Sequence, residues 1–157
     1  MSNKIFQLED LAAQLKQLRA SGKKIVHCHG VFDLLHLGHI RYLKEAKSFG
    51  DVLVVTITPD MYVRRGPARP AFSGELRAEA IAAIGVVDFV AINKWPTAID
   101  TIKILKPDFY IKGPDYKDYT KDVTGNIQSE EDAVSSVGGE IRFTSDIAFS
   151  STKLVNR

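Results

Sequence analysis

Hydrophobic residues along the chain follow two spacings in turn, and these spacings predict helices and strands. Leucines recur at helical spacing from Leu8 onward, which predicts a helix over Leu8–Ala20 that ends at Ser21-Gly22. Residues Val52–Thr58 are apolar or β-branched throughout, so we expect a strand that is buried on both faces. A strand of this kind is typical of the interior of a parallel sheet.

The same spacings and stop signals predict the other elements, in which helices and strands alternate. Further helices are expected at 38–48, 75–84, 97–105 and 129–137, and further strands at 24–29, 89–92, 109–112 and 140–143. This alternation implies an α/β fold, with a parallel sheet of about five strands and helices on both faces. No repeat and no long linker divides the chain, so residues 1–157 are expected to form a single domain.

Two segments do not fit this regular pattern. Residues 64–70 are basic and are interrupted by glycine and proline, which predicts a loop. The segment from Ser150 to Arg157 has the pattern of a helix that is cut short. Such an ending is consistent either with a domain excised from a longer polypeptide or with a frayed natural terminus.

The composition favours small charged partners. The chain has 21 lysines and arginines against 19 aspartates and glutamates, so it lacks the one-sided field expected of a nucleic-acid or membrane binder. Its first residues lack the apolar core of a signal peptide, and the longest apolar stretch, 78–92, is interrupted by Asp88 and is too short to span a bilayer. The single cysteine, Cys28, lies in a Val/Ile-rich run, so we expect a packed thiol in a cytoplasmic protein.

The strongest chemical signal lies where the first predicted strand runs into a helix, in the segment His29–His39. Gly30 allows the backbone to approach a ligand closely, and the helix N-terminus near Gly38 offers N–H groups to phosphate oxygens. His36 and His39 can share one face of the first helical turn and donate to a transferring phosphoryl group. Two histidines alone would more often cap and solvate a helix start, but the strand-turn-helix context favours the functional interpretation.

This segment also resembles a known signature. Gly30-Val31-Phe32-Asp33 followed by His36-Leu37-Gly38-His39 is similar to the first signature of the cytidylyltransferase-like nucleotidyltransferase superfamily, and Ser150–Lys153 is similar to its second. Lys112–Lys117 and the spacing from Arg69 to Arg77 resemble the adenylyltransferase domain of ADP-heptose synthases. The resemblance implies a Rossmann-like fold, a magnesium-bound nucleoside triphosphate, attack by a substrate phosphate on the α-phosphorus, and release of pyrophosphate. Heptose enzymes often carry a sugar kinase on the same polypeptide, so a fused kinase and a homodimer are left open as partners.

The resemblance implies roles for individual residues. His36, His39 and Thr152 would be catalytic. Arg65 and Arg77 would bind phosphate; a cation at a helix start such as Arg77 opposes the helix dipole, so a role beyond helix stability would explain it. The nucleotide would be bound by residues after the first and fourth predicted strands and in the second signature, namely Gly30, Val31, Phe32, Gly38, Lys112, Gly113, Asp115, Ser151 and Thr152.

Some of these roles have structural alternatives. Gly113-Pro114-Asp115 is equally typical of a structural turn, and for Asp33 we favour a cap of the turn over a ligand contact. The chain departs from the family pattern at His29, where relatives commonly carry asparagine or tyrosine, and it lacks the glycine usual before Ser150.

Three rival functions remain open at this stage. The nucleotide is ATP if the acceptor is a sugar phosphate, as the central segment favours, or CTP if the acceptor is a polyol phosphate such as glycerol 3-phosphate. A metal-dependent hydrolase would need His27 and His29 to converge with His36, His39 or a carboxylate, because such sites require three or four ligands. A non-catalytic nucleotide sensor would use the same pocket without turnover.

Overall fold

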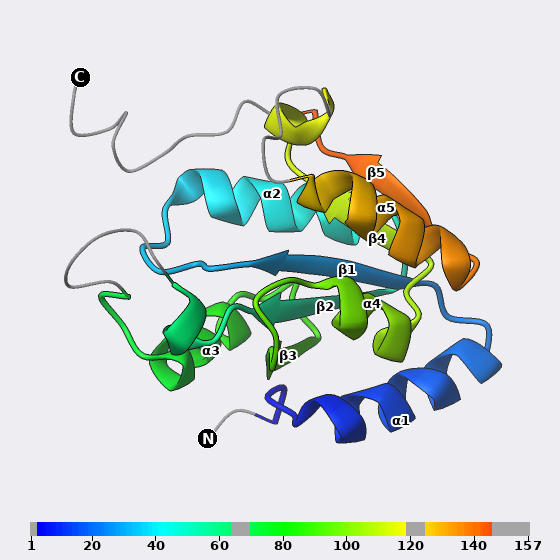
Figure 1. Cartoon of the computed structure of the whole chain (residues 1–157). Coiled ribbons are helices and arrows are strands. Elements are labelled where there is room, and N and C mark those ends of the chain that lie inside the picture. The colour runs from blue at the N-terminus through cyan, green and yellow to red at the C-terminus, as the bar shows by residue number, and fades with distance from the viewer. Residues whose placement is uncertain (1–2, 64–69, 119–124, 146–157) are drawn as a thin grey trace.

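A parallel sheet forms the centre of the molecule, as seen in a computed structural model that describes residues 3–63, 70–118 and 125–145 (Figure 1). Its five strands pair in parallel in the order β3-β2-β1-β4-β5. The predicted α/β fold is therefore confirmed. The strands are β1 (Ile25–Gly30), β2 (Val52–Ile57), β3 (Phe89–Ile92), β4 (Phe109–Lys112) and β5 (Glu140–Phe143).

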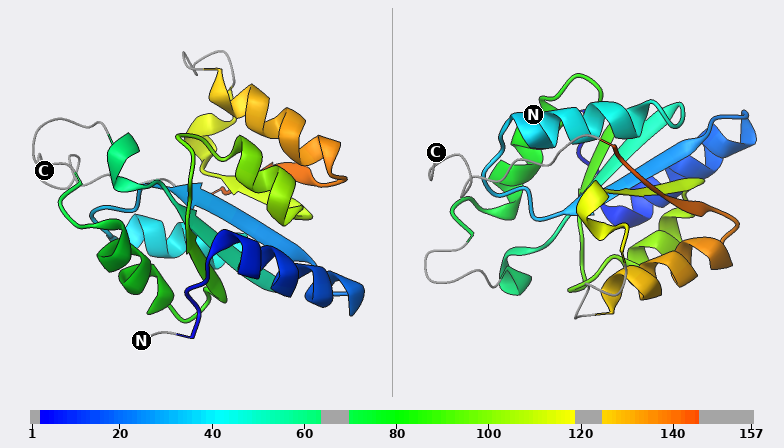
Figure 2. Two further views of the ribbon diagram at one scale, coloured as in Figure 1. Left: turned by 60° about the horizontal axis from the view of Figure 1, so that its bottom comes forward. Right: turned by 90° about the horizontal axis from the view of Figure 1, so that it is seen from above.

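Helices cover both faces of this sheet, as predicted (Figures 1 and 2). Side chains of α2 and α3 share a core with one face, and side chains of α1, α4 and α5 pack on the other. None of the helices in the described ranges is long and apolar enough to cross a lipid bilayer. The helices are α1 (Leu8–Ala20), α2 (Leu37–Lys47), α3 (Gly74–Ala82), α4 (Ile99–Leu105) and α5 (Asn126–Ser136), with single 3₁₀ turns η1 (Asp60–Tyr62) and η2 (Pro114–Tyr116).

The central strand β2 is buried along its whole length, which follows from its uninterrupted apolar and β-branched sequence. Leu53 and Val55 face the core beneath α2 and α3, whereas Val54 packs with the leucines of α1. Full burial of one such leucine or valine stabilises the fold by about 1.5–3 kcal/mol. Cys28 lies in the first of these cores, and burial raises the pKa of its thiol to about 12. It is the packed thiol that the sequence predicted.

Both edges of the sheet have features that the hydrophobic pattern did not reveal. Next to β3, the Val90 amide donates to the Lys4 carbonyl and the Phe6 amide donates to the Val90 carbonyl, each at 2.9 Å. The N-terminal segment thereby lies along the β3 edge as a short parallel bridge. At the opposite edge, β5 exposes Glu140 and Arg142, which pair with each other.

Candidate active site

The direction of strand order changes between β1 and β4, because β2 and β3 lie on one side of β1 while β4 and β5 lie on the other. In parallel sheets, the region beyond the carboxyl ends of the strands at such a switch point is the usual place for a ligand. Gly30 ends β1 and Lys112 ends β4. The two sequence segments singled out for nucleotide binding therefore follow the two strands of the switch point.

His36 and His39 hold each other in place at the start of α2. The His36 Nδ1 accepts from the Gly38 amide at 3.1 Å, and the His39 Nδ1 accepts from the His36 amide at 3.3 Å. The two ring centroids are 4.0 Å apart. Since each Nδ1 accepts a backbone N–H, the proton of each neutral imidazole must be on Nε2. The cap and the catalytic interpretation are thus compatible, because capping uses the Nδ1 atoms and puts the proton of each ring on Nε2.

Phe32 has a backbone conformation that is rare for a residue with a side chain, with φ at 51°. Its ring is buried and lies edge-on to His39, with centroids 5.6 Å apart. A Cβ placed on Gly30 would lie 3.0 Å from this ring, so a larger residue there would have to displace the ring. Strained backbone of this kind costs about 1–3 kcal/mol and is typical of functional sites. Contacts of Gly30, Val31 and Phe32 with the triphosphate stay a prediction. Phe32 would make its contact through the backbone, because its ring is buried.

The Asp33 carboxylate binds backbone groups of a distant segment, a role that neither of our two sequence interpretations named. It accepts from the Ala71 amide at 2.7 Å and from the Phe72 amide at 3.0 Å. Hydrogen bonds of backbone N–H groups to an ionised carboxylate are stronger than those between neutral groups. Asp33 therefore joins the loop after β1 to the segment that leads into α3.

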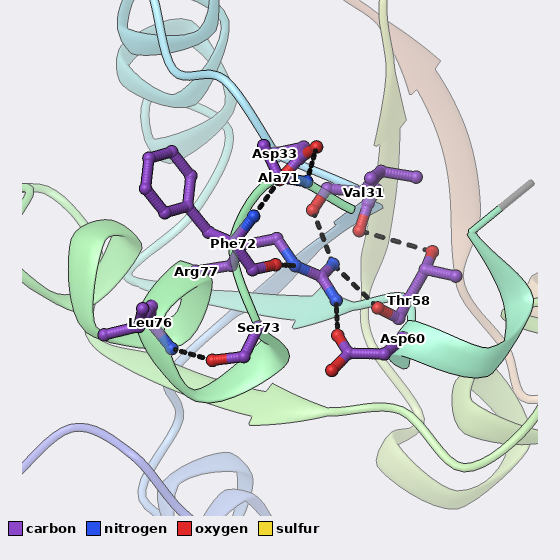
Figure 3. Close-up of polar contacts among 10 residues, drawn as sticks. Val31, Asp33, Thr58, Asp60, Ala71, Phe72, Ser73, Leu76 and Arg77 are labelled. Atoms are coloured by element: carbon purple, nitrogen blue, oxygen red, sulfur yellow. Dashed lines mark hydrogen bonds and ion pairs between the residues drawn. The ribbon is translucent and has the colours of Figure 1, made fainter. Parts of the chain in front are cut away.

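Arg77 strengthens this junction from inside the protein (Figure 3). Its guanidinium is buried and donates to the carbonyls of Val31, Thr58 and Phe72 at 2.8–3.0 Å, and it pairs with the Asp60 carboxylate at 2.5 Å. Oxygen atoms of the protein therefore surround the positive charge at this helix start. No substrate phosphate is needed to explain why an arginine is there. Phosphate binding by Arg77 stays a prediction, and the observed contacts favour a structural role instead.

The residues after β4 form the other side of the switch point. The Lys112 ammonium lies 3.9 Å from a Glu130 carboxylate oxygen and 4.5 Å from the centroid of the Tyr116 ring. Gly113 has an ordinary extended backbone, and a Cβ added to it would meet no atom of the described residues within 4 Å. Asp115 is exposed in η2. Within the described part of the chain, neither backbone conformation nor packing requires glycine at position 113, and there is room beside it for a ligand.

A row of polar side chains crosses the other face of the sheet. The Thr56 hydroxyl oxygen lies 2.7 Å from His27 Nε2 and 2.7 Å from His29 Nδ1. Burial lowers the pKa of both rings, that of His29 to about 3, with a further contribution from the Lys112 charge. A threonine inside an otherwise apolar strand was the available signal for this row, which our sequence interpretation missed.

The four histidines do not converge. His27 faces Tyr110 on the side of the sheet that packs against α4 and α5, and His29 shares that side because side chains alternate along a strand. His36 and His39 begin α2, which covers the opposite face. Across the described residues, no group of three or more His, Cys, Asp or Glu side chains is arranged to hold a metal ion. The geometry therefore does not support the metal-dependent hydrolase.

The lowered pKa values of His27 and His29 predict that stability falls in weak acid. The folded-state pKa of His29, about 3, lies below the usual value of 6.5, so between these values the unfolded chain binds a proton that the native chain does not. We expect the free energy of unfolding to decrease as pH falls below about 6.5, by up to about 1.4 kcal/mol per pH unit from His29. His27 contributes in the same direction.

Urea denaturation of the wild type and of His29→Gln between pH 7 and pH 5 measures this effect, since most carboxylates stay ionised there. The variant should show the shallower decrease. An equal slope in both proteins would mean that His29 titrates normally in the native state.

Three of the predicted site residues, Arg65, Ser151 and Thr152, lie outside the described residues. Their roles stay predictions.

Comparison with known proteins agrees with this geometry. The model of a family described as cytidylyltransferase-like matches residues 27–157. The bifunctional protein HldE of Sulfurimonas denitrificans is 45% identical over 125 residues, which are 78% of this chain and 26% of the relative. That of Geobacter metallireducens is 40% identical over 151 residues, which are 95% of this chain and 29% of the relative. The chain thus spans less than a third of the length of these curated relatives.

Solved structures show the same fold. A lipopolysaccharide core biosynthesis protein from Thermoplasma volcanium is 31% identical and has a TM-score of 0.64. The match covers 82% of this chain and 100% of that chain. A pantoate-beta-alanine ligase from Francisella tularensis has a TM-score of 0.61 at 18% identity, over 89% of this chain and 66% of that chain, and shows a shared fold alone. On the family match, the chain belongs to the cytidylyltransferase-like family and is a nucleotidyltransferase.

Proposed function

We propose that this domain transfers AMP from ATP to a sugar phosphate and releases pyrophosphate. The observation that carries the proposal is the reciprocal cap of His36 and His39, which presents two Nε2–H donors at a helix N-terminus beside the switch point. Donors fixed in this way are suited to an α-phosphoryl group that gains charge as it is transferred. They need no rearrangement during the reaction, because backbone N–H groups already hold both rings.

The reaction is a single displacement. An oxygen of the acceptor phosphate forms a bond to the α-phosphorus, and the bond from that phosphorus to the bridging oxygen of the β-phosphate breaks. The electron pair of the broken bond leaves with pyrophosphate. His36 and His39 would donate to the non-bridging oxygens of the α-phosphate, while the α2 N-terminus adds the favourable end of its dipole.

Magnesium fits this site as an ion that arrives with the nucleotide. Mg²⁺ is commonly held by substrate phosphates, water and one or two carboxylates rather than by a protein cage. The Asp33 carboxylate is bonded to two backbone amides and the Asp60 carboxylate to Arg77, so triphosphate oxygens would be the main ligands. When bound, the ion would neutralise charge on the triphosphate and the leaving pyrophosphate.

The choice of ATP and a sugar phosphate is supported by the Lys112–Lys117 segment, by the spacing from Arg69 to Arg77, and by the similarity to the HldE proteins. Those relatives are described as bifunctional. A sugar kinase domain on the same polypeptide is therefore part of the proposal for the whole protein.

A pyrophosphate-release screen tests the proposal directly. Purified protein with Mg²⁺ is offered ATP or CTP together with heptose phosphates, hexose phosphates or glycerol 3-phosphate. We expect release only with ATP and a sugar phosphate. Release only with CTP and glycerol 3-phosphate would establish the cytidylyltransferase instead. Nucleotide binding without release from any pair would indicate a sensor.

Gly113 provides a test of where the nucleotide binds. Gly113→Ala should leave folding almost unchanged, since the added methyl group meets no atom of residues 3–63, 70–118 or 125–145 within 4 Å and φ is −71°. If the nucleotide approaches here, the methyl group should weaken its binding roughly tenfold, within the range of about 1–3 kcal/mol usual for overpacking. Calorimetric titration with ATP measures the affinity.

Gly85 offers a matched control, because a Cβ there also meets none of the described atoms within 4 Å. Gly85→Ala should bind ATP like the wild type. Equal ATP affinity in both variants would place the nucleotide away from Gly113 and favour the structural turn.

A further inference from the structure

The row of polar side chains on β1 and β2 ends beyond the carboxyl ends of these strands, at Thr58 just after β2. Substrate is expected in this region. In the direction of the strands the row runs through His27, Thr56, His29 and Thr58. His27 and Thr56 are fully buried, whereas His29 is only half-buried, next to Gly30. The mechanism proposed above uses none of these four side chains.

The buried end of the row fixes where its protons lie. The Thr56 hydroxyl has one proton and contacts two ring nitrogens, so it donates to one and accepts from the other. His27 Nδ1 is buried, with no hydrogen-bond partner in the described part of the chain. Orphaned buried N–H groups are rarer than orphaned acceptors, so Nδ1 is the bare nitrogen and His27 Nε2–H donates to Thr56. Thr56 then donates to His29 Nδ1.

His29 must therefore carry its proton on Nε2, and the outer end of the row agrees. The Thr58 hydroxyl donates to the Gly30 carbonyl at 3.4 Å, which leaves its oxygen as an acceptor toward His29 Nε2 at 3.5 Å. A contact of 3.5 Å is at the limit of a hydrogen bond. The His29 ring is thus held by hydrogen bonds that run through Thr56 to His27, which form the relay. Its Nε2–H donor has only the distant Thr58 hydroxyl as an acceptor within the described residues.

We propose that His29 is a specificity-determining residue that donates Nε2–H to an oxygen atom of the substrate. This inference rests on the proposed function for the identity of that substrate. Its position beside Gly30 at the carboxyl end of β1 places the donor at the switch point, on the side opposite α2. A neutral donor there recognises a hydroxyl or phosphate oxygen, which either the nucleotide or the sugar phosphate offers.

The protonation of His29 can be measured without any activity. In protein labelled with ¹⁵N-histidine, long-range ¹H–¹⁵N correlation distinguishes the Nε2–H from the Nδ1–H tautomer. His29→Gln identifies the signal by its loss. We expect Nε2–H in the wild type, and a mixture of tautomers in Thr56→Val, which lacks the relay hydroxyl. Nδ1–H in the wild type would overturn the proposal.

Two conservative variants test the donor itself. The side-chain amide introduced by His29→Gln reaches about as far as the imidazole Nε2, whereas the shorter side chain in His29→Asn reaches only to the position of Nδ1. We expect His29→Gln to resemble the wild type and His29→Asn to raise one KM roughly threefold to tenfold at nearly unchanged kcat, as for the loss of one neutral hydrogen bond. A raised KM for ATP assigns the oxygen to the nucleotide, and a raised KM for the sugar phosphate assigns it to the acceptor.

Equal constants in the two variants would overturn the proposal, provided that both unfold at the wild-type temperature. If no substrate pair releases pyrophosphate, the proposed function fails while His29 can still be judged. Titration of labelled wild type with ATP and Mg²⁺, and separately with heptose phosphate, should then shift the His29 Nε2 resonance. No shift with either probe would overturn the donor role.

Discussion

Replacement of His39 by alanine is expected to lower turnover roughly 10²- to 10³-fold, equivalent to about 3–4 kcal/mol, with little change in nucleotide affinity. The reason is that a donor to the transferring phosphoryl group contributes most in the transition state. Alanine also removes the acceptor of the His36 amide, so a loss of about 1 kcal/mol in stability should accompany the kinetic effect. Steady-state pyrophosphate release and ATP titration measure the two quantities.

His39→Asn separates catalysis from capping. Its side-chain oxygen can accept the His36 amide, but nothing replaces the Nε2–H donor. We expect wild-type stability together with the low turnover of His39→Ala. If His39→Asn and His36→Ala both turned over like the wild type, the catalytic assignment of this pair would be wrong.

Replacement of Arg77 by methionine should lower the free energy of unfolding by about 3–5 kcal/mol, since each interior acceptor left without a donor costs about 1–3 kcal/mol. The carbonyls of Val31, Thr58 and Phe72 would lose their donor, and the loop after β1 would lose its anchor to α3. Turnover should fall as well, because that loop leads into the histidines. Arg77→Lys should recover little, since an ammonium cannot reproduce the planar fork.

Urea denaturation measures this effect, with Arg41→Met on the exposed surface of α2 as a matched control. The control should lie within about 0.5 kcal/mol of the wild type. If Arg77→Met were as stable as the control while the KM of a phosphorylated substrate rose, Arg77 would instead be the phosphate ligand first predicted.

The elements with the clearest periodicity were the ones that the sequence located well. The α1 helix, β3, β4 and β5 have the bounds that we predicted, because leucine spacing, short apolar runs or, in β5, the alternation of polar and apolar residues marks them. The α5 helix begins at Asn126 rather than at the predicted Ser129, immediately after Gly125 with φ at 72°. Ile127 is the single apolar residue of that first turn, and one apolar residue does not define a helical spacing, so that start was not predictable from spacing.

The candidate site was only partly predictable for a related reason. The position of His36 and His39 at a helix start followed from the local order of strand, turn and helix. The partners of Asp33 and Arg77 are mainly backbone groups brought in by distant segments, and backbone acceptors look alike in every sequence. The charged residues were therefore noticed, but what they bind depended on the tertiary fold.

The bridge between Lys4–Phe6 and β3 has a practical consequence. It occupies the amide and carbonyl of Val90 at an edge that would otherwise be open to another strand, and exposed edges promote aggregation. The opposite edge carries the charges of Glu140 and Arg142, which discourage such pairing. A shortened protein that starts at α1 would keep every predicted catalytic residue. It would, however, leave the amide and carbonyl of Val90 unpaired and open to another strand. Expression work should therefore retain these first residues.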